Sequence, residues 1–484
     1  MRKLTMKPSR VFYYFEEISR IPRGSGNTKG VSDFCAAFAK EQGLDYIQDA
    51  VNNVVIWKEG SKGREQEEPV ILQGHLDMVC EKNLDCAHDF KKDPLTLIVD
   101  GDCIRADQTT LGGDDGIAIA YALAILESSE YSHPPLEVIF TIDEETGMQG
   151  ATALDASVLK GHRVLNLDSE EEGILLTSCA GGVKCHCQLP VNHVEVEHMA
   201  RMEVEITGLS GGHSGTEIDK GRCNANKLMG RLLFHLSQKF SFGIASSRLS
   251  GGLQDNAIPR EARTVLFMEP ELAEQAAEEI RSFCQMMKEE LGRKEPELQI
   301  GTSLPVLQEK QSILSPSSAQ KVLFLLHQSP NGVQEMSSEI SGLVETSLNL
   351  GIMHLDEHMF TMDFAIRSSV GSAKVALRDK LIYLTEFLGG ECLADGDYPA
   401  WEFKRDSEFR EICIQAYQQV YGKEPEVKAL HAGLECGILS DKIKGFDAVS
   451  MGPDVYDIHT PQERMSIASV QRTWDYLLKI LEMV

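Results

Sequence analysis

The chain has 484 residues, 42% of them hydrophobic, and a formal net charge of −27. This length exceeds what one ordinary hydrophobic core accommodates, so two domains are expected. The negative charge argues against nucleic acid as a partner, and the sequence contains no apolar run of membrane-spanning length.

The first half alternates between helix and strand patterns. Amphipathic helices are predicted over 10–19 and 28–42, and strands over 53–58, 69–74 and 103–106. A helix over 116–128 and strands over 136–142 and 163–167 follow. This alternation predicts an α/β fold, with a mixed sheet flanked by helices.

The pattern changes near residue 184. A strand over 199–207 leads to helices over 219–238, 271–291 and 317–328, then to strands over 343–350 and 359–366 and a helix over 372–388. Two successive β-and-α groups predict an inserted α+β domain, built as a doubled β/α unit. We therefore expect a discontinuous first domain of residues 1–183 and 397–484, and a second domain of residues 184–396. The first ends with strands over 426–430 and 446–451 and a helix over 467–483.

Cysteine usage and the N-terminus bear on location. The 12 cysteines form no CxxC pair, and Cys185-His186-Cys187 is interpreted as part of a strand because a thiolate metal site would need a second pair. Scattered thiols indicate a reducing compartment. The basic N-terminus lacks the apolar stretch of a signal peptide. A bacterial cytoplasm is the expected location.

Five side chains of metal-binding type recur along the chain: His75, Asp114, Glu145, Asp168 and His459. Three of these groups directly follow short apolar strand patterns, and in an open α/β sheet ligands gather at the carboxyl ends of parallel strands. Any one of them alone has an ordinary alternative, because an Asp after a strand often caps a helix. Together they predict a hydrolytic site for zinc or manganese, built from imidazole and carboxylate without thiolate.

Glu144 and Glu145 are adjacent, and adjacent side chains on a regular strand face opposite ways. A bend at Thr146-Gly147 would let one glutamate bind metal while the other faces the attacking water. The alternative for this pair alone is an exposed acidic turn.

Several longer motifs resemble one known family. They are Gln73-Gly74-His75-Leu76-Asp77-Met78-Val79, Thr109-Thr110-Leu111-Gly112, Asp168-Ser169-Glu170-Glu171-Glu172-Gly173, Cys179-Ala180-Gly181-Gly182, Asn256-Ala257-Ile258-Pro259-Arg260-Glu261 and His431-Ala432-Gly433-Leu434-Glu435-Cys436-Gly437. The chain resembles the co-catalytic di-metal peptidases, which include aminoacylases, glutamate-releasing carboxypeptidases and carnosinases. Asp114-Asp115-Gly116 stands where the most similar subgroup often has Asp-Asn-Gly, a departure that keeps the ligand.

The resemblance implies two divalent metal ions, with zinc expected and manganese or cobalt as alternatives. Asp114 would bridge the metals, His75 and Asp168 would complete one site, and Glu145 and His459 the other. Glu144 would be the general base, and Asp77 would orient the His75 ring. The resemblance also implies a cis peptide bond between Asp114 and Asp115.

The second domain would act as a lid that contributes substrate contacts. The resemblance implies that His213 stabilises the oxyanion and that Arg367 binds the substrate's terminal carboxylate. Asn224 is a further candidate for a substrate contact. Without the resemblance, a polar turn and a surface salt bridge explain His213 and Arg367. His431 and Glu435 stay open, since Glu435 suits either a substrate α-amine or the cap of the following helix.

The predicted function is hydrolysis of dipeptides, with Xaa-His peptides and carnosine among the candidate substrates. An N-acyl amino acid deacylase of the same family is an alternative, and so is a non-catalytic metal-binding homologue. Dipeptides are the expected partners, with no nucleic acid and no membrane. The sequence leaves open whether the chain is a monomer or a homodimer.

Overall fold

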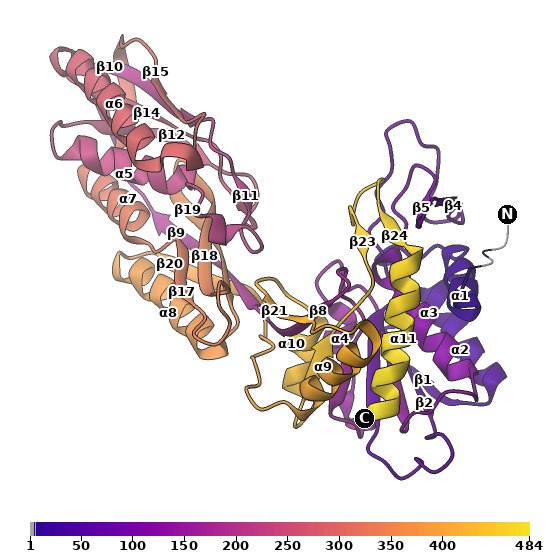
Figure 1. Ribbon diagram of the computed structural model, residues 1–484. Coiled ribbons are helices and arrows are strands. Elements are labelled where there is room, and N and C mark those ends of the chain that lie inside the picture. The colour runs from indigo at the N-terminus through magenta and orange to yellow at the C-terminus, as the bar shows by residue number, and fades with distance from the viewer. Residues whose placement is uncertain (1–3, 5) are drawn as a thin grey trace. The chain divides into compact units, whose positions relative to one another are not determined.

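The computed structural model describes residue 4 and residues 6–484, and these form two compact units (Figure 1). The first unit contains the chain up to Ser178 together with Phe403–Ala429 and Leu434–Val484. The second contains Cys179–Glu402 and Leu430–Gly433. The sequence-based boundaries were expected at 183/184 and 396/397. The catalytic and lid roles of the two domains stay predictions.

The first unit is built on an eight-stranded mixed sheet. Its strand order is β1-β2-β6-β3-β7-β22-β8-β21, with β1 Asp45–Gln48, β2 Val54–Lys58, β6 Leu136–Thr141, β3 Val70–His75, β7 Arg163–Asn166, β22 Asp447–Ser450, β8 Ile174–Cys179 and β21 Glu426–Leu430. The central strands β6, β3, β7 and β22 are parallel, whereas β2 and β8 join them antiparallel. The carboxyl ends of the four parallel strands therefore meet at one edge of the sheet.

Helices cover both faces of this sheet. They are α1 Ser9–Ser19, α2 Lys29–Gln42, α3 Gly113–Glu127, α4 Gln149–Ala153, α9 Glu408–Tyr421, α10 Glu435–Lys442 and α11 Ile467–Met483. Successive side chains of β3 point to opposite faces. A Cβ on Gly74 would lie 2.5 Å from Ala118 of α3, while the neighbouring Gln73 contacts Glu435 at the start of α10. Helices α3 and α10 therefore lie on opposite faces.

The core of the first unit forms around α3, whose helical part is apolar on all sides and almost entirely buried. It packs with Phe12 and Phe15 of α1 and with Trp474 of α11, and burial of such apolar surface is the main stabilising contribution. A small four-stranded sheet completes the unit, with β4 Leu97–Asp100, β5 Cys103–Ala106, β23 Val455–Tyr456 and β24 Arg464–Ser466.

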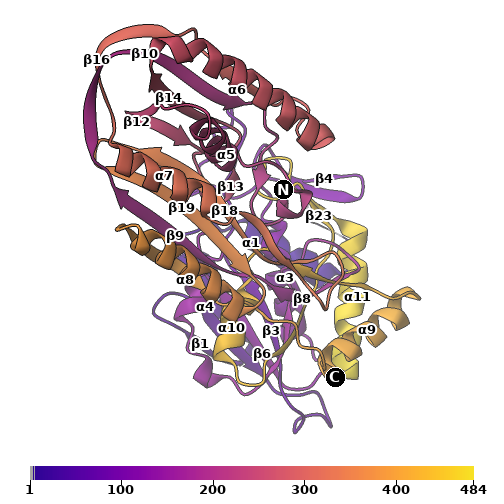
Figure 2. The same cartoon turned by 90° about the vertical axis from the view of Figure 1, so that its left-hand side faces the viewer.

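The second unit is a ten-stranded antiparallel sheet with four long helices along one face (Figure 2). Its strands are β9 Gly181–Pro190, β10 His193–Thr207, β12 Gly243–Gly251, β14 Ala262–Met268, β15 Gln299–Thr302, β16 Val306–Leu314, β17 Gly332–Met336, β18 Val344–Leu355, β19 Met359–Ser368 and β20 Glu391–Tyr398. The helices are α5 Ala225–Ser237, α6 Pro270–Leu291, α7 Pro316–Gln328 and α8 Gly371–Phe387. A two-stranded pairing joins β11 Gly212–His213 to β13 Ala257–Ile258.

The predicted fold class is confirmed, and most long elements lie where the sequence places them. Cys185 and Cys187 are buried on β9, as the strand interpretation requires. One helix prediction was wrong at its start. The helix predicted over 219–238 begins at Ala225, because Gly221 adopts a left-handed φ of 60° and Asn224 caps the helix by accepting a hydrogen bond from the backbone of Lys227.

Two further differences concern strands of the second unit. The strand predicted over 199–207 begins earlier, at His193, and its first part pairs with β16. Strand β20 was not predicted; it pairs with β9, so the chain stays within the second sheet through Tyr398, beyond the predicted boundary at 396/397. Among the described residues, none of the helices combines the length and apolar character needed to cross a membrane.

Candidate active site

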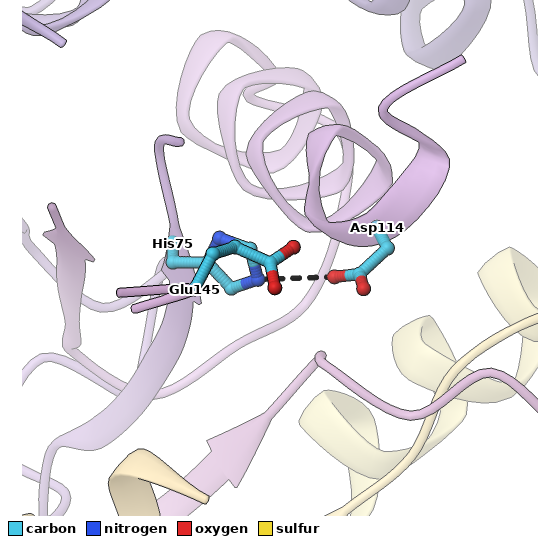
Figure 3. Close-up of side chains that lie close together, drawn as sticks. All are labelled: His75, Asp114 and Glu145. Atoms are coloured by element: carbon cyan, nitrogen blue, oxygen red, sulfur yellow. Dashed lines mark hydrogen bonds and ion pairs between the residues drawn. The ribbon is translucent and has the colours of Figure 1, made fainter. Parts of the chain in front are cut away.

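The structure brings together all five side chains of metal-binding type. Figure 3 shows three of them, His75, Asp114 and Glu145. His75 stands at the end of β3, with its Nε2 3.0 Å from Asp114 Oδ1 and 3.3 Å from Asp168 Oδ1. The second oxygen of Asp114 lies 3.2 Å from His459 Nε2, which is 3.1 Å from Glu145 Oε2. Asp114 thus lies between two imidazoles and presents one oxygen to each. This is the arrangement that a bridging carboxylate requires.

The loop that carries Asp114 is fixed by two charged residues that sequence reasoning missed. Buried Glu463 accepts hydrogen bonds from the backbone N–H groups of Leu111, Gly112 and Gly113, at 2.7–3.1 Å. Buried Arg23 donates to the carbonyls of Leu76 and Asp77 and to that of Gly112. It thereby joins the end of β3 to the Asp114 loop. Neither residue lies in a motif, so only the folded chain could reveal them.

The backbone at Asp114 is irregular. Asp114 and Asp115 have non-helical φ and ψ at the start of α3, and Gly112 before them has a φ of 65°, which favours glycine. The peptide bond between Asp114 and Asp115 is cis, so the prediction from the family resemblance is confirmed.

Asp77 positions the glutamate pair. Strand β6 ends at Thr141, so Glu144 and Glu145 lie in a turn, in which Asp143 has a φ of 53°. The Asp77 carboxylate accepts the backbone N–H of Glu144 at 3.0 Å and that of Glu145 at 3.3 Å. It also accepts the Ser25 hydroxyl at 2.8 Å and lies 3.4 Å from His75 Nδ1. Asp77 therefore connects the turn to the imidazole, a wider role than the orientation of His75 alone.

The site concentrates negative charge away from water. Burial, together with the charges of Asp168 and Glu435, raises the pKa of Glu144 well above its usual value. Contacts with Asp114 and Glu145 raise the pKa of His459 to about 11. Buried Glu145 Oε1 has no hydrogen-bond partner among the described residues. Carboxylate oxygens and imidazole nitrogens that converge on one place, with a buried oxygen that lacks a hydrogen-bond partner among the described residues, are the ligand atoms that a site for divalent cations needs.

Two further carboxylates lie at this site that the sequence did not single out. Asp115 is buried, accepts the backbone N–H of His75 at 3.1 Å, and groups with His75 and Asp168 as a second set of atoms that could hold a metal. Burial and the charge of Asp114 raise the pKa of Glu170 to about 8. Each is close in sequence to a predicted ligand, Asp115 next to Asp114 and Glu170 two residues after Asp168.

In the second unit, His213, Arg367 and His431 gather around Gly215. A Cβ on Gly215 would lie 2.7 Å from the His431 carbonyl oxygen, 3.0 Å from His213 Cε1 and 3.1 Å from Arg367 Nε. Arg367 donates to the Tyr398 hydroxyl at 3.1 Å, and His431 Nε2 lies 2.7 Å from the Ser347 hydroxyl. Burial and the nearby Arg367 charge lower the pKa of His213, and lower that of His431 to about 4.

The contacts of His213 define its proton position. Its Nδ1 accepts hydrogen bonds from the backbone N–H groups of Gly215 and Thr216, at 3.2 and 3.1 Å. A nitrogen that accepts from an N–H carries no proton, so in the neutral ring the hydrogen is on Nε2. His213 therefore presents a hydrogen-bond donor at its outer nitrogen.

Asn224 and Glu435 make contacts that differ from the predicted ones. Asn224 is buried, its Oδ1 caps α5, and its Nδ2 donates to Asn349 Oδ1 and the Leu350 carbonyl, both at 3.0 Å. These contacts occupy its polar atoms and support a structural role instead of a substrate contact. Glu435 does not cap α10, because its carboxylate accepts hydrogen bonds from Thr141 and Gln73.

The family follows from comparison with known proteins. Residues 71–483 match the model of peptidase family M20/M25/M40. The chain belongs to this family, so the predicted peptidase family is confirmed.

Individual relatives cover nearly the whole chain. The cytosol non-specific dipeptidase of Escherichia coli (strain K12) is 35% identical over 478 residues, which cover 99% of this chain and 98% of the relative. The crystal structure of aminoacylhistidine dipeptidase from Vibrio alginolyticus aligns with a TM-score of 0.94 at 36% identity, covering 99% of this chain and 97% of that one. An aminopeptidase PepT structure from Bacillus cereus, with 14% identity and a TM-score of 0.56, shares the fold over 99% of both chains.

The buried carboxylates predict a pH dependence of stability for the metal-free protein. The folded-state pKa values of Glu435 and Glu463 are raised to about 7, and that of Glu170 to about 8, by burial, whereas an exposed glutamate has a pKa of about 4.3. The folded state therefore binds protons that the unfolded state has released, and His459 acts in the same direction. Stability should fall as the pH rises from about 5 to 8.

Urea unfolding at several pH values, with EDTA and with Zn²⁺, measures this effect. Bound cations replace the protons, so Zn²⁺ should flatten the dependence. A stability in EDTA that rises with pH between 5 and 8 would contradict the prediction.

Proposed function

We propose that this chain is a di-metal dipeptidase of broad specificity, with Xaa-His dipeptides and carnosine among its substrates. The observation that carries the proposal is Asp114, whose two oxygens face His75 and His459, with Asp168 and Glu145 completing the two halves. The similarity to two dipeptidases over nearly the full chain supports the substrate class. A cytosolic location is part of this proposal and rests on the name of one of these relatives.

Two divalent cations, zinc in the first place, would be bound by His75, Asp114 and Asp168 on one side and by Asp114, Glu145 and His459 on the other. When bound, they supply Lewis acidity that makes a water nucleophilic at neutral pH. Glu144 takes a proton from the attacking water and later delivers it to the leaving amine nitrogen. Burial raises the pKa of Glu144 well above its usual value, which favours its acceptance of a proton.

The second unit supplies the proposed substrate contacts. His213 is neutral with its proton on Nε2 and donates that hydrogen to the oxyanion of the tetrahedral intermediate. Arg367 binds the terminal carboxylate of the dipeptide. Its Nε is buried and has no hydrogen-bond partner within the described part of the chain, which leaves a donor for a planar, bidentate contact.

A substrate panel tests the function. The metal-depleted protein, reloaded with Zn²⁺, Mn²⁺ or Co²⁺, should hydrolyse dipeptides with a free amine, carnosine and an Xaa-His dipeptide among them, and should cleave their N-acetylated forms poorly. Product formation can be followed by chromatography. Preferential cleavage of the N-acetylated forms would identify a deacylase, and no turnover of either series with any metal would identify a non-catalytic protein.

The roles of the two adjacent glutamates can be separated by substitution. Glu144→Gln keeps the shape but loses the base, so kcat should fall by about 10²–10⁴-fold while both metals stay bound. Glu145→Gln should weaken one metal site. Metal analysis and steady-state kinetics on both variants provide the measurement. The reverse pattern would mean that the two roles are exchanged.

Arg367 should restrict the enzyme to short peptides, because a clamp on the terminal carboxylate places the scissile bond one residue away. Arg367→Ala should cost about 1.5–3 kcal/mol in kcat/KM for dipeptides, the value of a charge-assisted hydrogen bond. Amidating the substrate's C-terminus should produce a similar loss in the wild type and little further loss in the variant. Equal cleavage of amidated and free dipeptides by the wild type would remove Arg367 from this role.

A further inference from the structure

Four buried polar side chains form a connected layer inside the first unit. Gln73 Nε2 donates to Glu435 Oε2 at 2.5 Å, and the Thr141 hydroxyl donates to the same oxygen at 2.6 Å. On its other side, Gln73 Oε1 accepts from Asn166 Nδ2 at 2.5 Å. All four side chains are almost completely buried. The layer therefore links strands β7, β3 and β6 to the first residue of α10.

Each strand member of this layer stands just before a residue of the candidate site. Gln73 is two residues before His75 on β3, and Asn166 is two residues before Asp168 at the end of β7. Side chains at i and i+2 of a strand share one face, so Gln73 lies directly beneath His75 on its face of the sheet. Thr141 is the last residue of β6, from which the turn with Glu144 and Glu145 departs.

Glu435 is an unusual residue to bury at this place. Its carboxylate is fully buried, and Oε1 has no hydrogen-bond partner among the described residues. A buried carboxylate costs free energy unless its contacts compensate for the loss of water. Glu435 also interacts electrostatically with the candidate site. Burial and the carboxylates of Asp168 and Asp77 raise the pKa of Glu435 to about 7. An apolar side chain would fill this place without that cost, so a core-filling role does not explain the residue.

We propose that Glu435 is a positioning residue for the di-metal centre, acting through Gln73 and Thr141. By accepting both donors at one oxygen, it orients the Gln73 amide so that its carbonyl meets Asn166. This sets the relative positions of the strand ends that carry His75, Asp168 and the glutamate turn. The inference rests on the proposed function and deepens it, because second-layer contacts of this kind tune metal affinity and activity.

The competing explanation is direct recognition of a substrate's α-ammonium group by Glu435. The two roles predict different effects on metal binding, kcat and KM when Glu435 is substituted. A positioning residue affects metal binding in the absence of substrate and lowers kcat. A substrate contact leaves metal binding unchanged, raises KM for free-amine dipeptides and reduces the discrimination against their N-acetylated forms.

Glu435→Leu in the full chain tests the proposal, because it removes both acceptor oxygens with little change in side-chain volume. Competition with a chromophoric chelator gives the Kd for Zn²⁺ without substrate, and steady-state kinetics with a dipeptide gives kcat and KM separately. We expect Zn²⁺ affinity and kcat each to fall about 10- to 100-fold, with KM changed by less than about threefold. Because the Kd is measured without substrate, an error in the proposed substrate class would not affect it.

Glu137→Leu is the matched control. Glu137 is also a buried carboxylate on β6, but it lies near the opposite end of the strand, and among the described residues it accepts hydrogen bonds only from the backbone N–H groups of Lys160 and Gly161. Its substitution should lower the melting temperature and leave Zn²⁺ affinity and kcat unchanged. If Glu435→Leu behaves as this control does, or raises KM alone, the positioning role is overturned.

The conservative variant Glu435→Gln provides a rescue. Its amide oxygen can accept both the Gln73 amide and the Thr141 hydroxyl, as Glu435 Oε2 does. Zn²⁺ affinity should be at least about tenfold higher than in Glu435→Leu. An affinity no higher than that of Glu435→Leu would show that Glu435 does not act through these hydrogen bonds.

Discussion

The burial of several carboxylates at one edge of a sheet is the constraint on which the rest of this molecule depends. Asp114, Glu145 and Asp168 converge with two imidazoles, and Glu144 lies beside them with a raised pKa. Like charges brought together away from water repel and lose hydration. Such a cluster is stable only with protons or cations bound, so we expect folding and metal binding to be coupled.

Many of the hydrogen bonds that hold the loops around this carboxylate cluster involve backbone groups. Glu463 is held by three successive N–H groups, Asp77 accepts two more from the glutamate turn, and Arg23 donates to three carbonyls. Hydrogen bonds from backbone donors satisfy a buried carboxylate without a competing side-chain cation. These hydrogen bonds can therefore fix the loops without using the carboxylate oxygens of the candidate metal ligands. Preorganisation of this kind is what a catalytic metal site requires.

The comparisons and the site geometry support each other in different ways. Membership of peptidase family M20/M25/M40 rests on residues 71–483, and two dipeptidases are similar over nearly the whole chain. The geometry adds what similarity does not, namely the proton position on His213 and the polar layer of Gln73, Thr141, Asn166 and Glu435. The function of a site depends on such contacts and not on the fold alone.

The sequence by itself determined the fold class and the candidate ligands. The reason is local, because hydrophobic period and turn residues mark the strands, and His75, Glu145 and Asp168 each lie at or shortly after the end of one. Tertiary structure alone decided the residues that act across long sequence separations. Glu463 binds a loop about 350 positions earlier, Arg23 joins two distant loops, and Glu435 meets Gln73 from the far end of the chain. Tertiary structure also decided where α5 begins. The Asn224 side chain caps this helix through its oxygen and donates through its nitrogen to Leu350 of β18. No local pattern encodes such contacts, because they arise only when the sheet assembles.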